Sequence, residues 1–375
     1  MGNCASSMAQ PRVVIAAGGT AGHVVPALAV ADALRAEGAS VSFLGAADRS
    51  EARLVPEAGY EIDLLQVSGL DRSNPLRAAR ALGLAGAAVP EARRVLRRRG
   101  AGAVLGGGGY VAAPAGLAAA SLRLPLVLTE ADRHLGMTNR LLARRARRVC
   151  LAFPIEGRTG ERYLVTGRPV PAAIGTAHRS AARERFGIAA EDRCLLVFGG
   201  SQGARSINVG ALDAFVTPDG AERDFHVLHI SGSRDYPEAL DRLTGAAPVP
   251  RYTLLEYEPG LADALAACDL VLARAGGSIF EIAAAGRPAI LVPYPYAAGR
   301  HQHANAEWMV EGGAALAIED AELEPVRLRE LAAELLGDRE RLARMAAASA
   351  GLARPDAAER VAAEVLAAIR EPSRG

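Results

Sequence analysis

The sequence predicts an α/β protein with two domains of the same architecture, each a parallel sheet covered by helices on both faces. Short apolar runs alternate with helical stretches along the chain, a pattern typical of such sheets. The same unit also occurs twice, since apolar residues 13–16 lead into a GGT turn and apolar residues 195–198 lead into a GGS turn. A chain of 375 residues suits two domains of about 150–200 residues each.

The first half of the chain repeats strand, turn and helix. Residues 13–16 are apolar and partly β-branched, as in a buried strand, and a helix is expected over residues 25–36, where Gly38 ends it. Further strands, separated by helical stretches, are expected at residues 41–44, 62–67, 103–105, 126–128 and 149–152.

The second half is organised around residues 269–308. Residues 270–273 predict a buried strand, and a helix over residues 279–285 follows a turn of small residues. Residues 289–292 predict the next parallel strand, which makes a βαβ unit. Ligands of such units bind beyond the carboxyl ends of the strands, where the turn at residues 276–278 and the polar residues 300–303 are expected.

The domain boundaries follow from this duplication. Residues 167–175 are the best linker, because two prolines stiffen the chain there. The first domain is expected at residues 12–166 and the second at residues 176–350. A final helix within residues 351–375 remains, and with both domains already complete it can pack back on the first.

Composition excludes several classes of protein. A formal net charge of +1 gives no general attraction to nucleic acid. The four cysteines are scattered without a CxxC pair, which disfavours a zinc site or a disulfide framework. No apolar run approaches a membrane span or a secretory leader, so a soluble or peripheral protein is expected. The N-terminal MGNCASS matches a myristoylation pattern, although an irregular tail is the simpler interpretation.

Four glycine turns each open a helix. None carries the G-x-G-x-x-G pattern of dinucleotide sites, and a chain without lysine cannot form a P-loop. One such turn alone would only permit tight packing, but four of them favour the binding of phosphate and sugar. Glu281, one helical turn beyond residues 276–278, is placed to accept hydrogen bonds from two vicinal hydroxyls. Together these features predict a nucleotide-sugar site.

Five motifs follow one another in order: GGTAGHVVPALAVADAL (18–34), GGGGYVAAPAGLAA (106–119), FGGSQGARSIN (198–208), EIAAAGRPAILVPYP (281–295) and HQHANAE (301–307). Together they resemble the MurG family of bacterial glycosyltransferases. The resemblance implies a GT-B fold, in which two Rossmann-like domains face a cleft. It also implies inverting transfer of N-acetylglucosamine from UDP-N-acetylglucosamine to the muramyl sugar of undecaprenyl-pyrophosphoryl-MurNAc-peptide (lipid I to lipid II) in peptidoglycan synthesis. No metal, other cofactor or nucleic acid is implied.

The same resemblance implies roles for individual residues. Ser201 would touch the donor diphosphate, Glu281 would hold the ribose hydroxyls and Gln302 would contact the sugar. The backbone near Glu258 would meet the uracil. The implied donor-binding residues are Thr20, Ala21, Gly22, Asp132, Ser201, Glu258, Gly277, Ser278, Ile279, Phe280, Glu281 and Gln302, and the implied acceptor-binding residues are Gly109 and Tyr110.

Three segments depart from the family pattern. Its HEQN appears here as TEAD, which keeps Glu130 and replaces the asparagine by Asp132. Its NPVR appears as RPVP at residues 168–171, without the terminal arginine. The turn at residues 276–280 is one residue shorter than usual. These departures concern the acceptor more than the donor.

Direct displacement at the anomeric carbon needs a base for the acceptor hydroxyl and stabilisation of the departing UDP. Helix N-termini after Gly203 and Gly277 can stabilise the diphosphate without a metal. His23 is the first candidate base, since the positive end of a helix keeps an imidazole neutral. The alternative is that His23 hydrogen-bonds the acceptor pyrophosphate. Glu130 is the second candidate base.

The stretch from Arg72 to Arg99 predicts a peripheral contact with the inner face of the cytoplasmic membrane, because eight arginines and one acid alternate there with apolar residues. The alternative is two amphipathic helices with solvated arginine faces. The apolar residues concerned are Leu76, Leu82, Leu84, Val89, Val95 and Leu96.

Three other functions stay open on the sequence alone. A related transferase could act on a glycolipid or a natural product, and a soluble acceptor would need no membrane face. A UDP-N-acetylglucosamine 2-epimerase on the same fold would need no acceptor. A nucleotide-sugar sensor would bind the donor and release no UDP.

Overall fold

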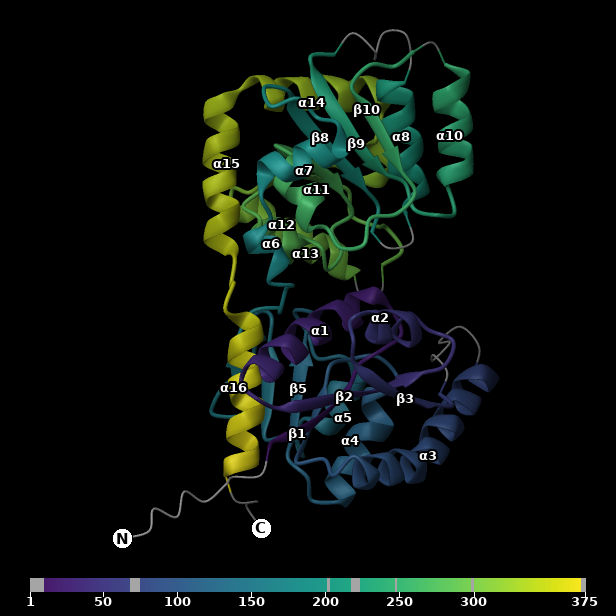
Figure 1. Cartoon of the computed structure of the whole chain (residues 1–375), viewed down its shortest axis with the longest axis vertical. Helices are drawn as coiled ribbons and strands as arrows, with labels where there is room; N and C mark the ends of the chain where they lie inside the picture. Colours follow the sequence, from purple (N-terminus) through teal and green to yellow (C-terminus); the bar gives the residue numbers. More distant parts are fainter. Residues whose placement is uncertain are drawn as a thin grey trace. The chain divides into compact units, whose positions relative to one another are not determined.

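The computed structural model describes residues 10–67, 75–200, 203–216, 223–246, 248–297 and 300–371, with the backbone alone for residues 75–83 and 85. The chain divides into two compact units, labelled by element in Figure 1. The first unit comprises Met1–Pro171 and Asp356–Gly375, and the second comprises Ala172–Pro355. The division after Pro171 falls within the suggested linker, whereas residues 351–355 belong to the second unit.

Seven parallel strands form the sheet of the first unit, in the order β3-β2-β1-β4-β5-β6-β7. The last strand, β7, escapes prediction because it has only three residues and none of them is buried. The strands are β1 (Arg12–Ala16), β2 (Ser40–Ala46), β3 (Glu61–Leu65), β4 (Ala103–Gly106), β5 (Leu126–Glu130), β6 (Arg148–Leu151) and β7 (Tyr163–Val165).

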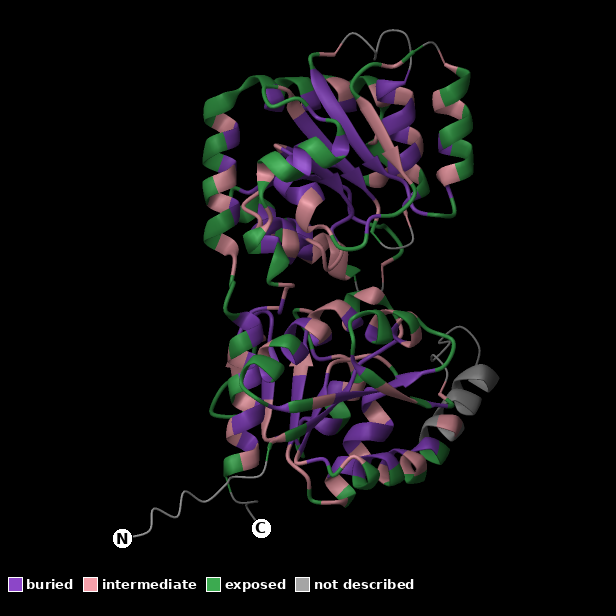
Figure 2. Ribbon diagram, viewed as in Figure 1, coloured by how far each residue is buried: buried purple, intermediate pink, exposed green. Residues whose placement is uncertain are grey.

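Helices cover both faces of this sheet. Side chains alternate along β1, so that Val13 and Ile15 join one core with α1 and α16 while Val14 and Ala16 join the other core with α3 and α4. Figure 2 shows the buried strands between helices whose outer sides are exposed. The final helix therefore completes the first unit. The helices are α1 (Ala21–Ala36), α2 (Glu51–Glu57), α3 (Pro75–Arg98), α4 (Ala112–Ser121), α5 (Met137–Leu142) and α16 (Ala357–Arg370).

Six parallel strands form the sheet of the second unit, in the order β10-β9-β8-β11-β12-β13. Numbered from the first strand of each unit, both sheets share the order 3-2-1-4-5-6. Sheets of this kind bind ligands at the carboxyl ends of the strands, where the order reverses between strands 1 and 4. The strands are β8 (Arg193–Phe198), β9 (Phe225–Ile230), β10 (Tyr252–Leu255), β11 (Leu270–Ala273), β12 (Ala289–Leu291) and β13 (Ala315–Ala317).

Helices also surround the second sheet. Leu195 and Val197 of β8 pack with apolar residues of α8 and α14 to form the main core. No helix within the described ranges has both the length and the apolar composition needed to cross a membrane. The helices are α6 (Ala173–Thr176), α7 (Arg179–Phe186), α8 (Arg205–Phe215), α10 (Tyr236–Gly245), α11 (Ala262–Ala267), α12 (Ile279–Ala284), α13 (His301–Glu311), the 3-10 helix η2 (Asp320–Glu322), α14 (Pro325–Gly337) and α15 (Arg339–Leu352).

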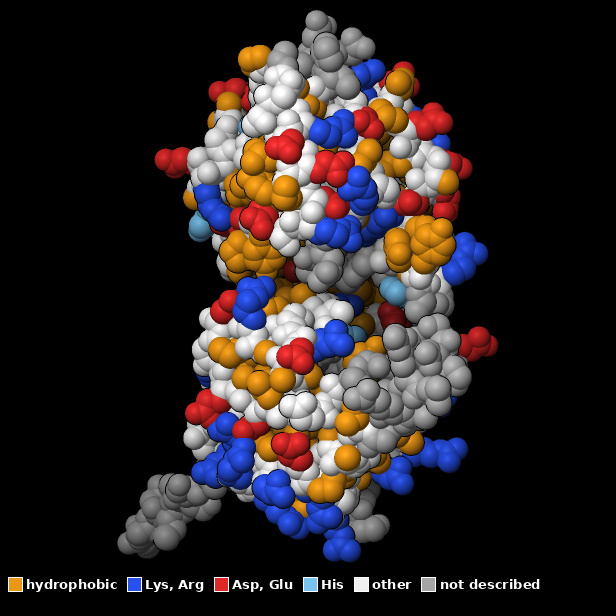
Figure 3. Space-filling model, turned by 90° about the vertical axis from the view of Figure 1, so that its right-hand side faces the viewer, with side chains coloured by type: hydrophobic (Ala, Val, Ile, Leu, Met, Phe, Trp, Pro, Cys, Tyr) orange, Lys and Arg blue, Asp and Glu red, His pale blue; other side chains and the backbone are white. Residues whose placement is uncertain are grey.

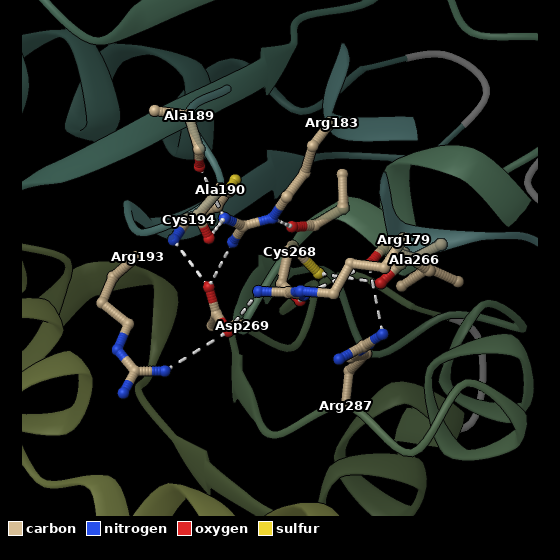
Figure 4. A network of polar contacts seen from close by, with 12 residues as sticks. Arg179, Arg183, Ala189, Ala190, Arg193, Cys194, Ala266, Cys268, Asp269 and Arg287 are labelled. Carbon is tan, nitrogen blue, oxygen red and sulfur yellow. Dashed lines mark hydrogen bonds and ion pairs between the residues drawn. The ribbon is translucent and has the colours of Figure 1, made fainter. Parts of the chain in front are cut away.

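An arginine network closes the amino-terminal end of the second sheet (Figure 4). Asp269, just before β11, accepts hydrogen bonds from Arg179 at 2.7 Å and from Arg183 at 2.9 Å. The backbone N–H of Cys194 donates to the same carboxylate at 2.9 Å. Arg183 also donates to the carbonyl oxygen of Ala267, the last residue of α11. The network therefore neutralises a helix C-terminus and ties it to two strands.

Candidate active site

The first glycine turn joins β1 to α1. This helix begins at Ala21 rather than at Val25, with Thr20 in an extended conformation as its N-cap. The backbone N–H of His23 donates to the carbonyl oxygen of Thr20 at 3.0 Å. Thr20, Ala21, Gly22 and His23 therefore stand at the positive end of a helix of 16 residues.

The glycine turn after β4 packs against the first turn. Gly108 and Gly109 have φ of +95° and +79°, a region that favours glycine. A Cβ atom at Gly109 would lie 1.9 Å from the carbonyl oxygen of Gly18, and one at Gly108 would lie 2.6 Å from Nδ1 of His23. Tyr110 follows and is 43% exposed. The predicted acceptor residues Gly109 and Tyr110 therefore lie in the turn that packs against His23.

His23 is surrounded by features that keep it neutral. Burial is the main cause that lowers the pKa of His23 to about 4; the charge of Arg168 lowers it further and that of Asp132 raises it. Arg168 also donates a hydrogen bond from Nη2 to the carbonyl oxygen of Gly22. A neutral imidazole has one nitrogen that can accept a proton. The geometry is compatible with both predicted roles of His23, as a base and as a hydrogen-bond partner of the acceptor.

Glu130, the second predicted base, is buried, and its carboxylate is hydrogen-bonded on both oxygens. One carboxylate oxygen accepts from the backbone N–H groups of Ala131 at 3.0 Å and Asp132 at 3.2 Å. The other accepts from the N–H of Gly136 at 2.7 Å and from Nδ2 of Asn139 at 2.9 Å. Burial is the main cause that raises the pKa of Glu130, and the hydrogen bonds from Gly136, Asn139 and Asp132 oppose it. Because four protein donors occupy its oxygens, Glu130 anchors the loop after β5 that carries Asp132.

A carboxylate that sequence reasoning missed lies beneath the first glycine turn. Glu51, the first residue of α2, is fully buried. Its Oε2 accepts from the backbone N–H of Gly19 at 2.9 Å, and its Oε1 accepts from that of Ala46 at 3.0 Å. Acidic residues are common in the first turn of helices, so no pattern in the sequence singles this one out.

The second unit carries the predicted donor residues of the turn after β11. Gly277 and Ser278 directly precede α12, and Glu281 lies half-buried in its first turn. Ile279 and Phe280 are buried, and the ring of Phe280 lies 5.3 Å from that of Trp308. Ile279 and Phe280 can therefore meet a donor only through their backbone. Ser201, which follows β8, lies outside the described residues, and its contact with the diphosphate stays a prediction.

Two amide side chains of α13 hold the neighbouring loops. Oε1 of Gln302 accepts from the backbone N–H of Tyr294 at 2.9 Å, just beyond β12. Nδ2 of Asn305, which is buried, donates to the carbonyl oxygen of Ala275 at 2.9 Å. Asn305 was not predicted, yet its hydrogen bond holds Ala275, the residue directly before the turn at residues 276–278. A Cβ atom at Gly276 would lie 3.9 Å from Nε2 of Gln302, so Gln302 lies beside the turn that precedes α12 and Glu281. Its contact with the donor sugar stays a prediction.

Arg274 is a third residue for which the sequence predicted no role. It lies at the end of β11 and is only 9% exposed. Its guanidinium donates to Oγ of Ser206 at 2.7 Å and to the carbonyl oxygen of Val292 at 3.2 Å, and it pairs with Asp320. These contacts join the ends of β11 and β12 to the start of α8. An arginine within a turn of small residues is the only sign of this network in the sequence.

Glu258 is held by its side chain. Its two carboxylate oxygens accept from the two terminal nitrogens of Arg185 at 2.7 and 2.8 Å, which makes a bidentate ion pair. With the side chain occupied in this way, Glu258 can present its backbone to a ligand. That is the form of contact the resemblance implied.

No grouping of three His, Cys, Asp or Glu that could hold a metal ion occurs among the described side chains. Nε2 of His303, a residue of α13, lies 3.4 Å from Oε2 of Glu319. Cys150, Cys194 and Cys268 are buried, and burial raises the pKa of each thiol.

The basic stretch in α3 is only partly described. Figure 3 shows arginine side chains gathered at the lower end of the first unit. Arg94 and Arg97 are exposed, whereas Arg98 and Arg99 form ion pairs with Asp63. Two of the apolar residues offered as a membrane patch, Val95 and Leu96, belong instead to the core. The remaining apolar side chains are half-buried (Leu84, Val89) or lie outside the described side chains (Leu76, Leu82).

Family models match both units. Residues 13–151 match the glycosyltransferase family 28 N-terminal domain, and residues 194–361 match its C-terminal domain. The chain is 41% identical to the UDP-N-acetylglucosamine–N-acetylmuramyl-(pentapeptide) pyrophosphoryl-undecaprenol N-acetylglucosamine transferase of Moorella thermoacetica, over 96% of this chain and 99% of that protein. The two matched ranges contain all four glycine turns.

Solved structures give the same assignment. The MurG structure from Acinetobacter baumannii matches with a TM-score of 0.73 and 30% identity, over 96% of this chain and 99% of that one. The UDP-GlcNAc 2-epimerase of Neisseria meningitidis matches with a TM-score of 0.66 but only 14% identity, over 96% and 99% of the two chains, which shows the shared fold alone. The chain has the two-domain GT-B fold and belongs to the MurG family of N-acetylglucosaminyltransferases, within glycosyltransferase family 28.

Proposed function

We infer that this chain transfers N-acetylglucosamine from UDP-N-acetylglucosamine to the muramyl sugar of undecaprenyl-pyrophosphoryl-MurNAc-pentapeptide, the step from lipid I to lipid II. The observation that carries this function is the end-to-end similarity to transferases of the same activity. Around it, the described residues among those implied for donor and acceptor lie at the carboxyl edges of the two sheets, where ligands of this fold class bind.

Most of the donor contacts are assigned to the second unit. Glu281, in the first turn of α12, supplies carboxylate oxygens for the ribose hydroxyls, and Gln302, beside Gly276 in the turn before α12, contacts the sugar. The backbone N–H groups at the starts of α8 and α12 are the donors for the diphosphate. These groups bind UDP through fixed dipoles, and they stabilise the negative charge that it gains on departure.

The acceptor hydroxyl is assigned to the first unit, near His23. In the transfer, oxygen of that hydroxyl bonds to the anomeric carbon from the face opposite UDP. The bond between that carbon and the phosphate oxygen breaks, and the configuration inverts. The hydroxyl proton goes to the neutral imidazole of His23. Glu130 is left in a supporting role, since its oxygens already accept four hydrogen bonds.

A lipid-linked acceptor requires the protein to work at a membrane, and we assign it a peripheral place on the cytoplasmic face. Arg94 and Arg97 are exposed and give the outer surface of α3 positive charge, which can contact an anionic bilayer. Each such residue near an anionic bilayer is worth about 1 kcal/mol. Equal binding to anionic and neutral liposomes would contradict the assignment.

UDP release tests the function. Wild type is incubated with UDP-N-acetylglucosamine, with and without a short-chain lipid I analogue, beside Glu281→Ala. Loss of hydrogen bonds to a charged group is expected to lower donor affinity by about 10- to 100-fold. Glu307→Gln is the matched control, because Glu307 is an exposed carboxylate of the same unit.

Each alternative gives a different result in this assay. Release that depends on the analogue and collapses in Glu281→Ala supports the transferase. Turnover of the donor without the analogue would indicate an epimerase. Donor binding without any release would indicate either a transferase whose acceptor the TEAD segment has changed or a nucleotide-sugar sensor. Trials with other alcohols separate the two, because only a transferase would then release UDP.

A further inference from the structure

We propose that Glu51 is a positioning residue for the transfer reaction, which holds the first glycine turn so that His23 keeps its place against the acceptor turn. The family resemblance assigns no role to this residue. The proposal rests on the proposed function, because it concerns the same site, and its test is designed so that either can fail alone.

Glu51 is a buried carboxylate whose partners are backbone groups. Oε2 accepts from the N–H of Gly19 at 2.9 Å and Oε1 from the N–H of Ala46 at 3.0 Å. Burying a carboxylate is costly unless its oxygens are hydrogen-bonded. Within the described part of the chain, no arginine or histidine is paired with Glu51 by an ion pair. These two donors therefore define its place, and they link the end of β2 to the turn after β1.

The space around the carboxylate is tight. A Cβ atom at Gly18 would lie 2.1 Å from Oε1 of Glu51, and one at Gly45 would lie 2.7 Å from its Cγ. The side chain thus fills the gap between two glycines at adjacent strand ends. A change in its length or hydrogen bonding must move the backbone at Gly18 and Gly19.

Such a movement reaches His23 through direct contacts. The carbonyl oxygen of Gly18 touches the turn at Gly109, where a Cβ atom would lie 1.9 Å away. The next residues, Thr20 to His23, form the first turn of α1, and the imidazole lies against Gly108. Glu51 therefore holds the turn at Gly18 and Gly19, and this turn packs against the one that places His23 beside the predicted acceptor residues.

A purely structural role would lower the stability of the whole chain and, with it, every activity. A positioning role affects catalysis more than donor binding, because the implied contacts to the ribose and the sugar, Glu281 and Gln302, belong to the second unit. Of the implied donor residues, Thr20 to Gly22 follow directly on the turn that Glu51 holds. The two roles are therefore separated by measuring kcat together with the Kd for UDP-N-acetylglucosamine.

The first variant is Glu51→Gln. The amide keeps the size of the side chain but retains one acceptor and presents an NH2 group, so that one of the two backbone N–H groups loses its partner. We expect kcat with the lipid I analogue to fall about 10- to 100-fold, since small misplacements of catalytic groups have effects of this size. The Kd for the donor should stay within about twofold, well under the 1.4 kcal/mol of a tenfold change.

Glu57→Gln is the matched control, because Glu57 is exposed at the end of the same helix. It should leave both kcat and Kd unchanged. A folded Glu51→Gln variant that transfers sugar at the wild-type rate would overturn the proposal. If Glu51→Gln binds no donor, Glu51→Asp replaces it, since its shorter carboxylate can reach only one of the two N–H groups. Wild-type kcat in that variant overturns the proposal, and a loss supports it.

A second readout needs no activity. In protein labelled with 15N-glycine, the amide of Gly19 should exchange with solvent faster in Glu51→Gln than in wild type. An unchanged exchange rate overturns the proposal. If wild type does not transfer sugar at all, the proposed function fails, while the Gly19 amide still decides whether Glu51 holds the turn.

Discussion

Arg168 donates a hydrogen bond to the carbonyl oxygen of Gly22, the residue that precedes His23. This contact puts a positive charge at the N-terminal end of α1, where the helix dipole is also positive. Burial and Arg168 together lower the pKa of His23 to about 4. Arg168 is the first residue of the RPVP segment, so the departure from the family's NPVR brings an arginine to this histidine.

The first prediction concerns the pH dependence of kcat/KM, which reports groups of the free enzyme. A base must be unprotonated, so wild type should stay active as the pH falls below 6.5 and lose activity near pH 4. Arg168→Gln removes the second cause of the lowered pKa and leaves burial in place. The acid limb of the kcat/KM profile should therefore move to higher pH, by part of the difference between the pKa of about 4 in the protein and the ordinary histidine pKa of 6.5.

The control for this shift is Arg162→Gln, an exposed arginine of the same unit. Its acid limb should coincide with that of wild type. If Arg168→Gln and wild type share one acid limb while both are folded, His23 is not the group that titrates in the profile, and the base must be sought elsewhere.

The second prediction concerns stability at low pH. Burial lowers the pKa of His229 to about 3 and is the main cause that lowers that of His226 to about 4. Between about pH 6.5 and pH 4 the unfolded chain binds protons that the folded unit does not. The free energy of unfolding should therefore decrease as the pH is lowered through this window, by about 2 kcal/mol per histidine between pH 7 and pH 5.

Hydrogen exchange of β9, which carries both histidines, measures this effect in the intact chain. His229→Gln should lower stability at pH 7 but make its decline toward pH 5 less steep. His134→Gln, at an exposed histidine of the first unit, should leave the decline unchanged. A wild-type β9 equally protected at both pH values would contradict the prediction.

The third prediction concerns Asp269→Asn. Arg183 is 4% exposed and loses its anionic partner in this variant, although the amide keeps one acceptor. Breaking a buried pair in this way costs about 3–5 kcal/mol. Thermal unfolding should therefore show the second unit melting several degrees lower. Asp213→Asn, which breaks the more exposed pair with Arg242, should cost less than about 1 kcal/mol.

Much of the fold follows from patterns in the sequence. Central strands such as β1, β4, β8 and β11 are runs of apolar residues, and these were predicted because burial on both faces demands them. The strands β7, β9, β10 and β13 were not predicted. The start of α1 was misplaced because Thr20 and Gly22 suggest a turn. The first turn of a helix leaves its N–H groups unpaired, so glycine is tolerated there and gives no sign of the true boundary.

The supporting residues of the site could not be predicted in the same way. Glu51 and Gly19 are 32 positions apart, and Arg168 and Gly22 are 146 apart. Glu51 meets Gly19 because β2 lies beside β1 in the strand order, whereas Arg168 reaches Gly22 from the segment after the edge strand β7. Periodicity describes single elements and carries no information about that order. Site residues that lie within a recognisable motif were therefore predicted, whereas Glu51 and Arg168, which position those residues through hydrogen bonds, were not.

The fourth prediction concerns Gly108→Ala. Gly108 has φ of +95°, and a Cβ atom there would lie 2.6 Å from Nδ1 of His23. The variant should therefore carry two separate penalties. Left-handed backbone costs about 1–2 kcal/mol in any residue with a side chain. The contact must also push the imidazole away from the acceptor turn, which should lower kcat by about 10- to 100-fold.

Gly38→Ala separates the two penalties. Gly38 has φ of +80° and nothing within 4 Å of the added Cβ, so this variant shares the backbone strain without the clash. Both variants should lose similar stability on thermal unfolding, and only Gly108→Ala should lose activity. Equal kcat in the two variants would mean that His23 can move without cost to the reaction. The imidazole would then be a binding group for the acceptor rather than its base, because a base must stay within hydrogen-bond reach of the proton that it removes.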